Sequence, residues 1–118
     1  MSEINSYHAH IYYDEVTYEQ ASKLCDVVAK KFNVPVGYKH KQLVGPHPMW
    51  SCQITLMSET FATVIPWLMV NRSGLTVFVH ANTGDDLKDH TEYTMWMGAI
   101  EPLNLEIFRT ATVSEGWI

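Results

Sequence analysis

Residues 6–13 read Ser-Tyr-His-Ala-His-Ile-Tyr-Tyr, and this alternation constrains the fold more than any other stretch of the chain. Successive side chains of a β-strand point to opposite faces, so a strand here puts an apolar row on one face. The other face carries His8, His10 and Tyr12. Residues two apart on a strand have backbones about 6–7 Å apart, which lets both imidazoles reach one metal ion. Two alternatives stay open: one ring binds the ion while the other contacts a substrate, or both face water from an edge strand.

The composition excludes several classes of function. The chain has 118 residues, 47% of them hydrophobic and 18% charged, which is typical of one soluble globular domain spanning residues 1–118. A net charge of −5 argues against nucleic acid and membranes as partners. The apolar run 61–70 is broken by Pro66 and is shorter than the roughly 20 residues of a membrane span. Cys25 and Cys52 lie in apolar patterns and are expected as reduced core residues, and without a signal-peptide pattern we expect a cytoplasmic protein.

The order of local patterns predicts a β-α-β-β-α-β chain with a C-terminal extension. Strands are expected at residues 6–13, 36–44, 49–57 and 75–80, and helices at 18–32 and from 58 to about 70, with a kink or break at Pro66. The extension is expected to hold a short helix within 85–93, capped by Asp85 or Asp86, and a possible fifth strand within 103–107.

This order is typical of an α+β, ferredoxin-like antiparallel sheet with both helices on one face. The other face of such a sheet is left for a ligand or for a second copy of the chain. Because an open apolar sheet face is often buried by a partner, we expect a homodimer.

Two further histidines stand in unusual settings. His47 lies between Pro46 and Pro48, which restrict the backbone on both sides and so limit where the imidazole points. His80 ends the strand expected at 75–80 and leads into the polar loop 81–86, a kind of segment that often carries function. Either residue also has a plain structural explanation, as the middle of a rigid turn or as a loop-facing strand end.

Convergence of these histidines with His8 and His10 predicts a metal site. Three neutral imidazoles, or two with a carboxylate, bind Fe(II), Zn(II) or Mn(II) and leave coordination positions open. The chain has no Cys-x-x-Cys pair, which favours oxygen chemistry at non-haem iron over a structural zinc. The candidate carboxylates, none of which the spacing singles out, are Asp14, Glu59, Asp85 and Asp86.

No other catalytic pattern competes well with this one. The sequence has no glycine-rich phosphate loop and no Gly-x-Ser-x-Gly motif. Asp89-His90 is either an acid/base pair or an ordinary polar stretch of a solvated helix.

Four segments follow one another across nearly the whole chain: His8-Ala9-His10-Ile11-Tyr12-Tyr13-Asp14, Val44-Gly45-Pro46-His47-Pro48-Met49-Trp50, Val79-His80-Ala81-Asn82-Thr83-Gly84-Asp85-Asp86, and Asp89-His90-Thr91 with Trp96-Met97-Gly98. Together they resemble the DOPA 4,5-dioxygenase family of small extradiol ring-cleaving proteins. The Gly-Pro-His-Pro and His-x-Asn-Thr-Gly pieces are the specific ones. Ala81 departs from the proline expected there, a change that loosens the loop.

The resemblance implies a ferredoxin-like dimer that opens the ring of a DOPA-like or related catechol with O₂ at a metal. That metal is expected to be Fe(II), with Zn or Mn as alternatives. The expected ligands are His8, His10 and His80, with His47 beside them or in place of one. His47 or His8 is expected as the catalytic proton acceptor, because imidazole titrates near neutral pH. Substrate contacts are expected at Tyr12, Trp50 and His90, with Trp96 as a further aromatic wall.

Two other functions stay open from the sequence. One is a metal-free ferredoxin-like dimer whose histidines hydrogen-bond a small aromatic ligand. The other is a cofactor-independent oxygenase, in which the substrate ring itself activates O₂.

Overall fold

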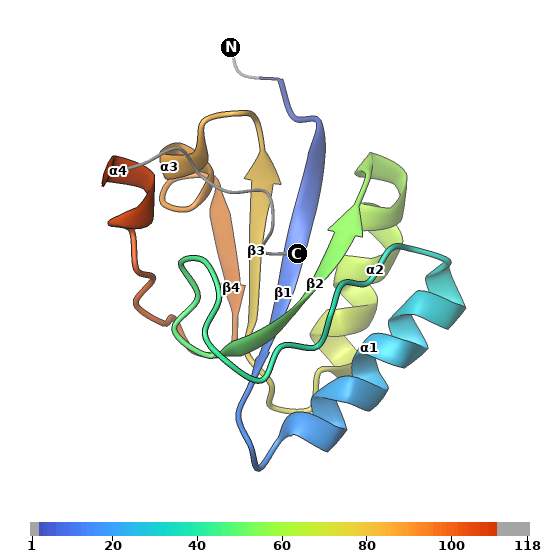
Figure 1. Cartoon of the computed structure of the whole chain (residues 1–118). Helices are drawn as coiled ribbons and strands as arrows, with labels where there is room; N and C mark the ends of the chain where they lie inside the picture. Colours follow the sequence, from blue (N-terminus) through green and yellow to red (C-terminus); the bar gives the residue numbers. More distant parts are fainter. Residues whose placement is uncertain (1–2, 111–118) are drawn as a thin grey trace.

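The strand β1 (Ser6–Tyr13) is the axis of the sheet in the computed structural model, which describes residues 3–110 (Figure 1). The sheet is antiparallel with four strands in the order β2-β1-β3-β4. The other strands are β2 (Trp50–Leu56), β3 (Val77–Asn82) and β4 (Thr94–Met97). Residues 1–2 and 111–118, which belong to the predicted single domain and C-terminal extension, lie outside the described residues.

One face of the sheet is packed against two helices, α1 (Tyr18–Phe32) and α2 (Ser58–Asn71). Ala9 and Ile11 of β1 are fully buried there, as the alternation of residues 6–13 predicts. Cys25 and Cys52 are buried in the same core as free thiols, which confirms the expectation from their apolar settings. The α+β class with a four-stranded antiparallel sheet is therefore confirmed.

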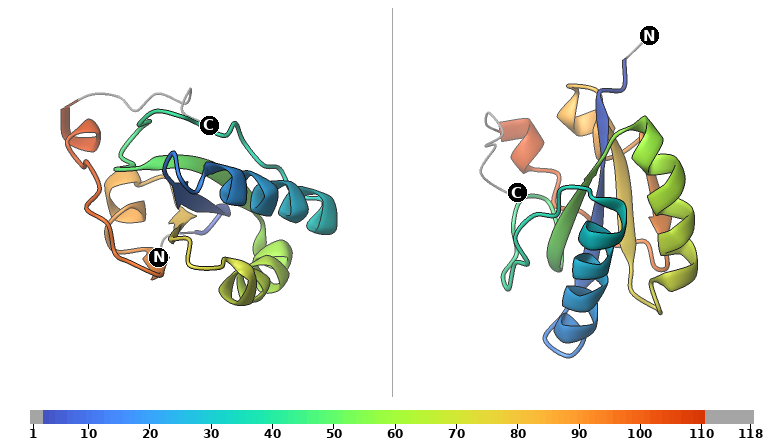
Figure 2. Two further views of the ribbon diagram at one scale, coloured as in Figure 1. Left: turned by 90° about the horizontal axis from the view of Figure 1, so that it is seen from below. Right: turned by 90° about the vertical axis from the view of Figure 1, so that its right-hand side faces the viewer.

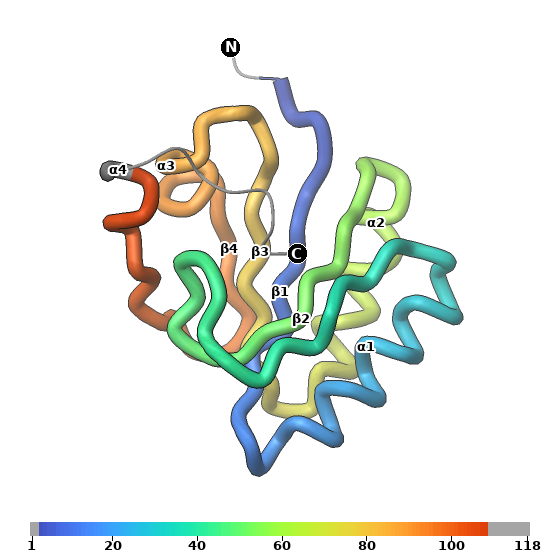
Figure 3. Tube along the Cα trace, viewed as in Figure 1, coloured from blue at the N-terminus to red at the C-terminus, as the bar shows by residue number. Residues whose placement is uncertain are grey.

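The expected strand at residues 36–44 is wrong. Only Val36 forms an isolated bridge, with Ile54 of β2. Beyond this bridge the Gly37 and His40 N–H groups donate to the Gln53 and Ser51 carbonyls of β2, at 2.7 Å and 3.1 Å. The rest of segment 33–49 then leaves the edge of β2 and runs over the sheet (Figure 3). It lies on the side away from α2 (Figure 2). The alternation in 36–44 is weak and charged, so little apolar burial holds this stretch in the sheet.

The fourth strand is β4, at the opposite edge, where it pairs with β3. The helix expected within 85–93 is α3 (Asp86–Asp89), and the side chain of Asp85 accepts a hydrogen bond from the Lys88 N–H at 3.1 Å, as its capping role predicts. The fifth strand expected within 103–107 is wrong. That stretch is irregular, the Asn104 N–H donates to the Pro46 carbonyl at 2.8 Å, and the helix α4 (Ile107–Thr110) follows.

Segment 33–49, α3 and α4 therefore lie over the sheet face that the sequence left open for a second copy (Figure 2). The homodimer was expected because this sheet face would be open and apolar. The face is covered by the chain itself, so that argument does not hold and the homodimer stays a prediction. Among the described residues, every helix is too short or too polar to span a bilayer.

Candidate metal centre

Strand register brings the histidines together. On β1, His8 and His10 share a face, and the β1–β3 pairing sets His8 opposite His80 and His10 opposite Phe78. Residues directly opposite in an antiparallel pair project to the same side of the sheet. Four side chains from two neighbouring strands therefore meet beneath the segment 33–49.

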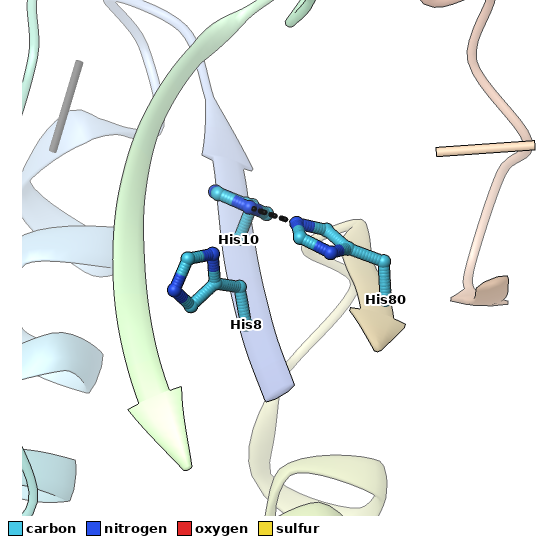
Figure 4. Close-up of side chains that lie close together, drawn as sticks. All are labelled: His8, His10 and His80. Carbon is cyan, nitrogen blue, oxygen red and sulfur yellow. Dashed lines mark hydrogen bonds between the residues drawn. The ribbon is translucent and has the colours of Figure 1, made fainter. Parts of the chain in front are cut away.

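The three imidazoles are close enough to share an ion. The Nε2 atoms of His10 and His80 lie 3.1 Å apart, and the His8 ring centroid lies 5.7 Å from that of His10 and 5.1 Å from that of His80 (Figure 4). One ligand atom from each residue can be chosen so that all three lie within 4.8 Å of one another. Among the histidine, cysteine, aspartate and glutamate side chains of residues 3–110, these three histidines form the group whose spacing could hold a metal ion.

The separation of the two Nε2 atoms fits ligands of one cation. Imidazole nitrogens bind such metals at about 2.0–2.1 Å, so two of them in octahedral or tetrahedral positions are about 2.9–3.4 Å apart. The observed 3.1 Å lies in this range. The donor set of three nitrogens without a thiolate suits Fe(II), Zn(II) or Mn(II).

Hydrogen bonding prepares His80 as a ligand. Its Nδ1 lies 3.1 Å from the Ala81 carbonyl oxygen, which only accepts, so Nδ1 carries the proton and Nε2 keeps its lone pair. Backbone carbonyls commonly orient metal-binding histidines in this way.

Burial keeps the three imidazoles neutral. It is the main cause that lowers the pKa of His10 and of His80 well below the usual 6.5, and it lowers the pKa of the half-buried His8 to about 4. Neighbouring imidazoles lower these pKa values further. Neutral imidazole is the form that binds a metal, so no proton has to leave before coordination.

His47 also reaches the cluster, from the segment 33–49. Its ring centroid lies 4.1 Å from that of His10, and its Nδ1 is 2.7 Å from the hydroxyl oxygen of Tyr12. Burial lowers the pKa of His47 to about 3 and raises that of Tyr12. The expected aromatic wall residue Tyr12 is thus also a hydrogen-bond partner of His47.

His90 completes the cluster from the end of α3. Its ring centroid lies 4.2 Å from that of His80 and 4.5 Å from that of Phe108. Nδ1 of His90 lies 2.7 Å from the Asp86 carbonyl oxygen, so it donates there and Nε2 keeps its lone pair. His90 is thus half-buried beside His80 and is not part of a fully solvated helix face, while the Asp89 carboxylate of the expected acid/base pair accepts hydrogen bonds from Thr83.

Trp50 is the expected site residue that the fold takes elsewhere. It pairs with Tyr13 on the helix-covered face and packs against the core, so its assignment as a substrate contact is corrected. Its place in the alternation with the buried Cys52 already predicted that face. Trp96, by contrast, lies on the histidine face, with its ring 4.5 Å from that of Phe78.

Two aromatic residues of the site were missed. The ring centroid of Phe78 is 5.5 Å from that of His80 and 5.9 Å from that of His10. Because Phe78 is two residues before His80 on one strand, the strand period alone predicts that it shares the face. Phe108 offers no such signal, since α4 reaches His90 only through the tertiary fold.

Carboxylates are not part of the group with metal-binding geometry. Asp14 accepts hydrogen bonds from the backbone N–H and hydroxyl of Thr17, and these lower its pKa. Asp85 caps α3. The candidate ligands within residues 3–110 are therefore all nitrogens.

Comparisons with known proteins give one family match and two similar sequences. A family model described as the Dopa 4,5-dioxygenase family matches residues 7–107. DOPA 4,5-dioxygenase of Amanita muscaria is 36% identical over 113 residues, which cover 88% of this chain and 50% of that protein. An uncharacterized 21.2 kDa protein of Botryotinia fuckeliana is 32% identical over 116 residues, which cover 88% of this chain and 63% of that protein. The chain thus spans between half and two thirds of the length of these two relatives.

The fold of the chain is also similar to that of a solved structure. A crystal structure from Nostoc punctiforme, described as a "putative dioxygenase", superposes with a TM-score of 0.87 at 38% sequence identity. The superposition covers 90% of this chain and 92% of that chain.

Proposed function

The chain belongs to the Dopa 4,5-dioxygenase family, and from this premise we propose that it is a dioxygenase that opens the ring of a catecholic substrate next to the diol. The proposed reaction uses O₂ at a non-haem metal held by His8, His10 and His80. The expected metal is Fe(II), with Zn(II) or Mn(II) as alternatives. The observation that carries the proposal is the 3.1 Å separation of the His10 and His80 Nε2 atoms beside a third imidazole.

Such a cation supplies Lewis acidity, which lowers the pKa of a catechol hydroxyl, and the redox chemistry with O₂ that ring cleavage needs. Three protein ligands leave room for substrate in the coordination shell. The chain itself supplies neutral nitrogens in a largely buried setting, where water competes little with the substrate.

The protein also has to receive the phenolic proton of the catechol. His90 suits a substrate contact, because its Nδ1–H is held by the Asp86 carbonyl and its Nε2 lone pair is free to accept a hydrogen bond. His8 and His90 are the half-buried members of the cluster, and their exposure lets water reach its edge and carry a proton away. The aromatic rings of Tyr12, Phe78 and Trp96 line the same face and suit a flat substrate ring.

The first experiment measures metal binding and turnover with untagged protein stripped of metal. We expect anaerobic Fe(II) titration to give one strong site per chain. After admission of O₂, simple catechols should give a yellow product with matching oxygen uptake, and chelation should abolish both. A protein that binds a catechol but neither metal nor O₂ would instead be the metal-free binding module.

Two substitutions test the ligand assignment. His10→Ala and His80→Ala should each weaken metal binding and turnover by about 100-fold or more. Removing a group that only orients a metal ligand already costs about 10–100-fold in metal affinity or activity, and these substitutions remove a ligand itself. His40→Ala is the matched control, since this imidazole lies in segment 33–49 outside the group with metal-binding geometry. Full metal occupancy in folded His10→Ala or His80→Ala protein would refute these ligands.

A further inference from the structure

We propose that Tyr12 is a positioning residue that fixes the tautomer of His47, so that His47 presents an N–H donor to a substrate oxygen. This differs from the sequence expectation, in which His47 accepts a proton. The inference rests on the proposed function for the identity of the acceptor, a catechol oxygen. The tautomer is a property of the protein alone.

The hydrogen bond between Tyr12 and His47 decides the tautomer. The hydroxyl oxygen lies 2.7 Å from Nδ1, and the two residues are only 1% and 5% exposed. If Nδ1 carried the proton, the phenolic hydrogen would need another acceptor, and the hydroxyl has no second hydrogen-bond partner among residues 3–110. A buried donor without a partner is unfavourable, so Tyr12 donates to Nδ1. The neutral imidazole then carries its one proton on Nε2.

His80 and His90 have the opposite tautomer. Each donates its Nδ1–H to a backbone carbonyl oxygen, at 3.1 Å and 2.7 Å, and keeps a lone pair on Nε2. A carbonyl oxygen only accepts and a phenol readily donates, so the two kinds of partner produce two kinds of imidazole. The cluster therefore offers lone pairs at His80 and His90 and a hydrogen at His47.

A donor at this position has a clear use. The His47 ring lies 4.1 Å from that of His10, beside the proposed metal ligands. A catechol that has lost a proton brings a negatively charged oxygen to this place. A pre-oriented N–H in a buried site stabilises such charge more strongly than water does, since the donor need not reorient. Tyr12 holds this donor in place through its hydroxyl group.

The first test reads the tautomer directly. Nitrogen-15 NMR of histidine-labelled, metal-free protein distinguishes a protonated Nε2 from a protonated Nδ1. We expect His47 to be protonated at Nε2 in the parent protein and to become a mixture of tautomers in Tyr12→Phe. Tyr13→Phe is the matched control, because its hydroxyl donates to the His40 and Ser51 carbonyls on the other face and should leave the His47 signals unchanged. A proton on Nδ1 in the parent, or an unchanged tautomer in Tyr12→Phe, would overturn the proposal.

The second test asks whether His47 works as a donor. Glutamine donates an N–H but cannot take up a proton, whereas leucine does neither. In Fe(II)-loaded protein we expect His47→Gln to keep kcat within about 10-fold of the parent and His47→Leu to lose about 100-fold or more. Equal losses in both variants would contradict the donor role. If the parent protein turns over no catechol, the proposed function fails, while the NMR result still decides the tautomer.

Discussion

Asp89 is a buried carboxylate, 2% exposed, whose two oxygens both accept hydrogen bonds from Thr83. One bond comes from the backbone N–H at 2.9 Å and the other from the hydroxyl at 2.6 Å. These contacts tie the loop after β3 to the end of α3. Because His80 lies before that loop and His90 follows Asp89 directly, this carboxylate helps to hold two imidazoles of the site at their spacing.

At the scale of single residues, we predict that Asp89→Ala lowers the free energy of unfolding by about 2 kcal/mol, because it leaves the Thr83 N–H and hydroxyl without their acceptor. The measurement is the urea midpoint of metal-free protein. Asp86→Ala, an exposed aspartate on the same helix, should change stability by less than about 0.5 kcal/mol. Equal midpoints for the two variants would argue against a structural role for Asp89.

At the scale of elements, α2 continues from Ser58 to Asn71 with Pro66 inside it. The helix is not split into a short turn and a main helix, one of the two outcomes expected at this residue. Proline removes a backbone donor and crowds the preceding turn. The buried stripe of Val64, Ile65 and Leu68 packs on the core and supplies the burial that holds the helix together across it.

We therefore predict that Pro66→Ala stabilises the protein. Inside a helix, proline is about 3 kcal/mol less favourable than alanine. The unfolded chain is more flexible with alanine, which lowers the stability of the variant by about 0.4–1 kcal/mol. The free energy of unfolding should therefore rise by about 2 kcal/mol. Pro66 is exposed, so no core packing is lost. Thermal unfolding measures the gain, with Met69→Ala, at 59% exposed, as a near-neutral control in the same helix. A lower Tm for Pro66→Ala would mean that proline at this position fits the packing of α2 better than alanine does.

At the scale of the whole molecule, the sheet separates two environments. The helix-covered face holds an apolar core, and the other face gathers imidazoles under segment 33–49, α3 and α4. The burial that brings these imidazoles together also makes their protonation unfavourable. The stability of the metal-free protein is thereby linked to pH.

The sign follows from the pKa values. His8 and His47 have folded pKa values of about 4 and about 3, below the 6.5 of an unfolded histidine, so the unfolded chain binds more protons in acid. The free energy of unfolding should be constant above about pH 7 and should fall as the pH drops below 6.5. Below the folded pKa values of His8 and His47, these two groups should cause no further change. Urea midpoints of chelator-treated protein between pH 7.5 and pH 4.5 check this range. His8→Gln should make the fall shallower, whereas a constant midpoint across the range would contradict buried neutral imidazoles.

The alternation in residues 6–13 by itself determined which side chains of β1 build the core and which share the other face, because the period of a strand is local. The same local rules predicted α1, the cap of α3 and the buried free cysteines. The strand period also predicts that Trp50 lies on the face away from the histidines and that Phe78 lies on the same face as His80.

Only the tertiary structure decided the rest. Contacts between residues far apart in sequence set His80 opposite His8 and Tyr12 against His47, and such contacts depend on register and loop paths that no local period encodes. The alternation in residues 36–44 was too weak to form a strand, so this stretch keeps only a bridge at Val36 and two backbone hydrogen bonds to β2. Nearby backbone carbonyls set the protons of His80 and His90, whereas long-range packing brought the rings together and placed Tyr12 against His47.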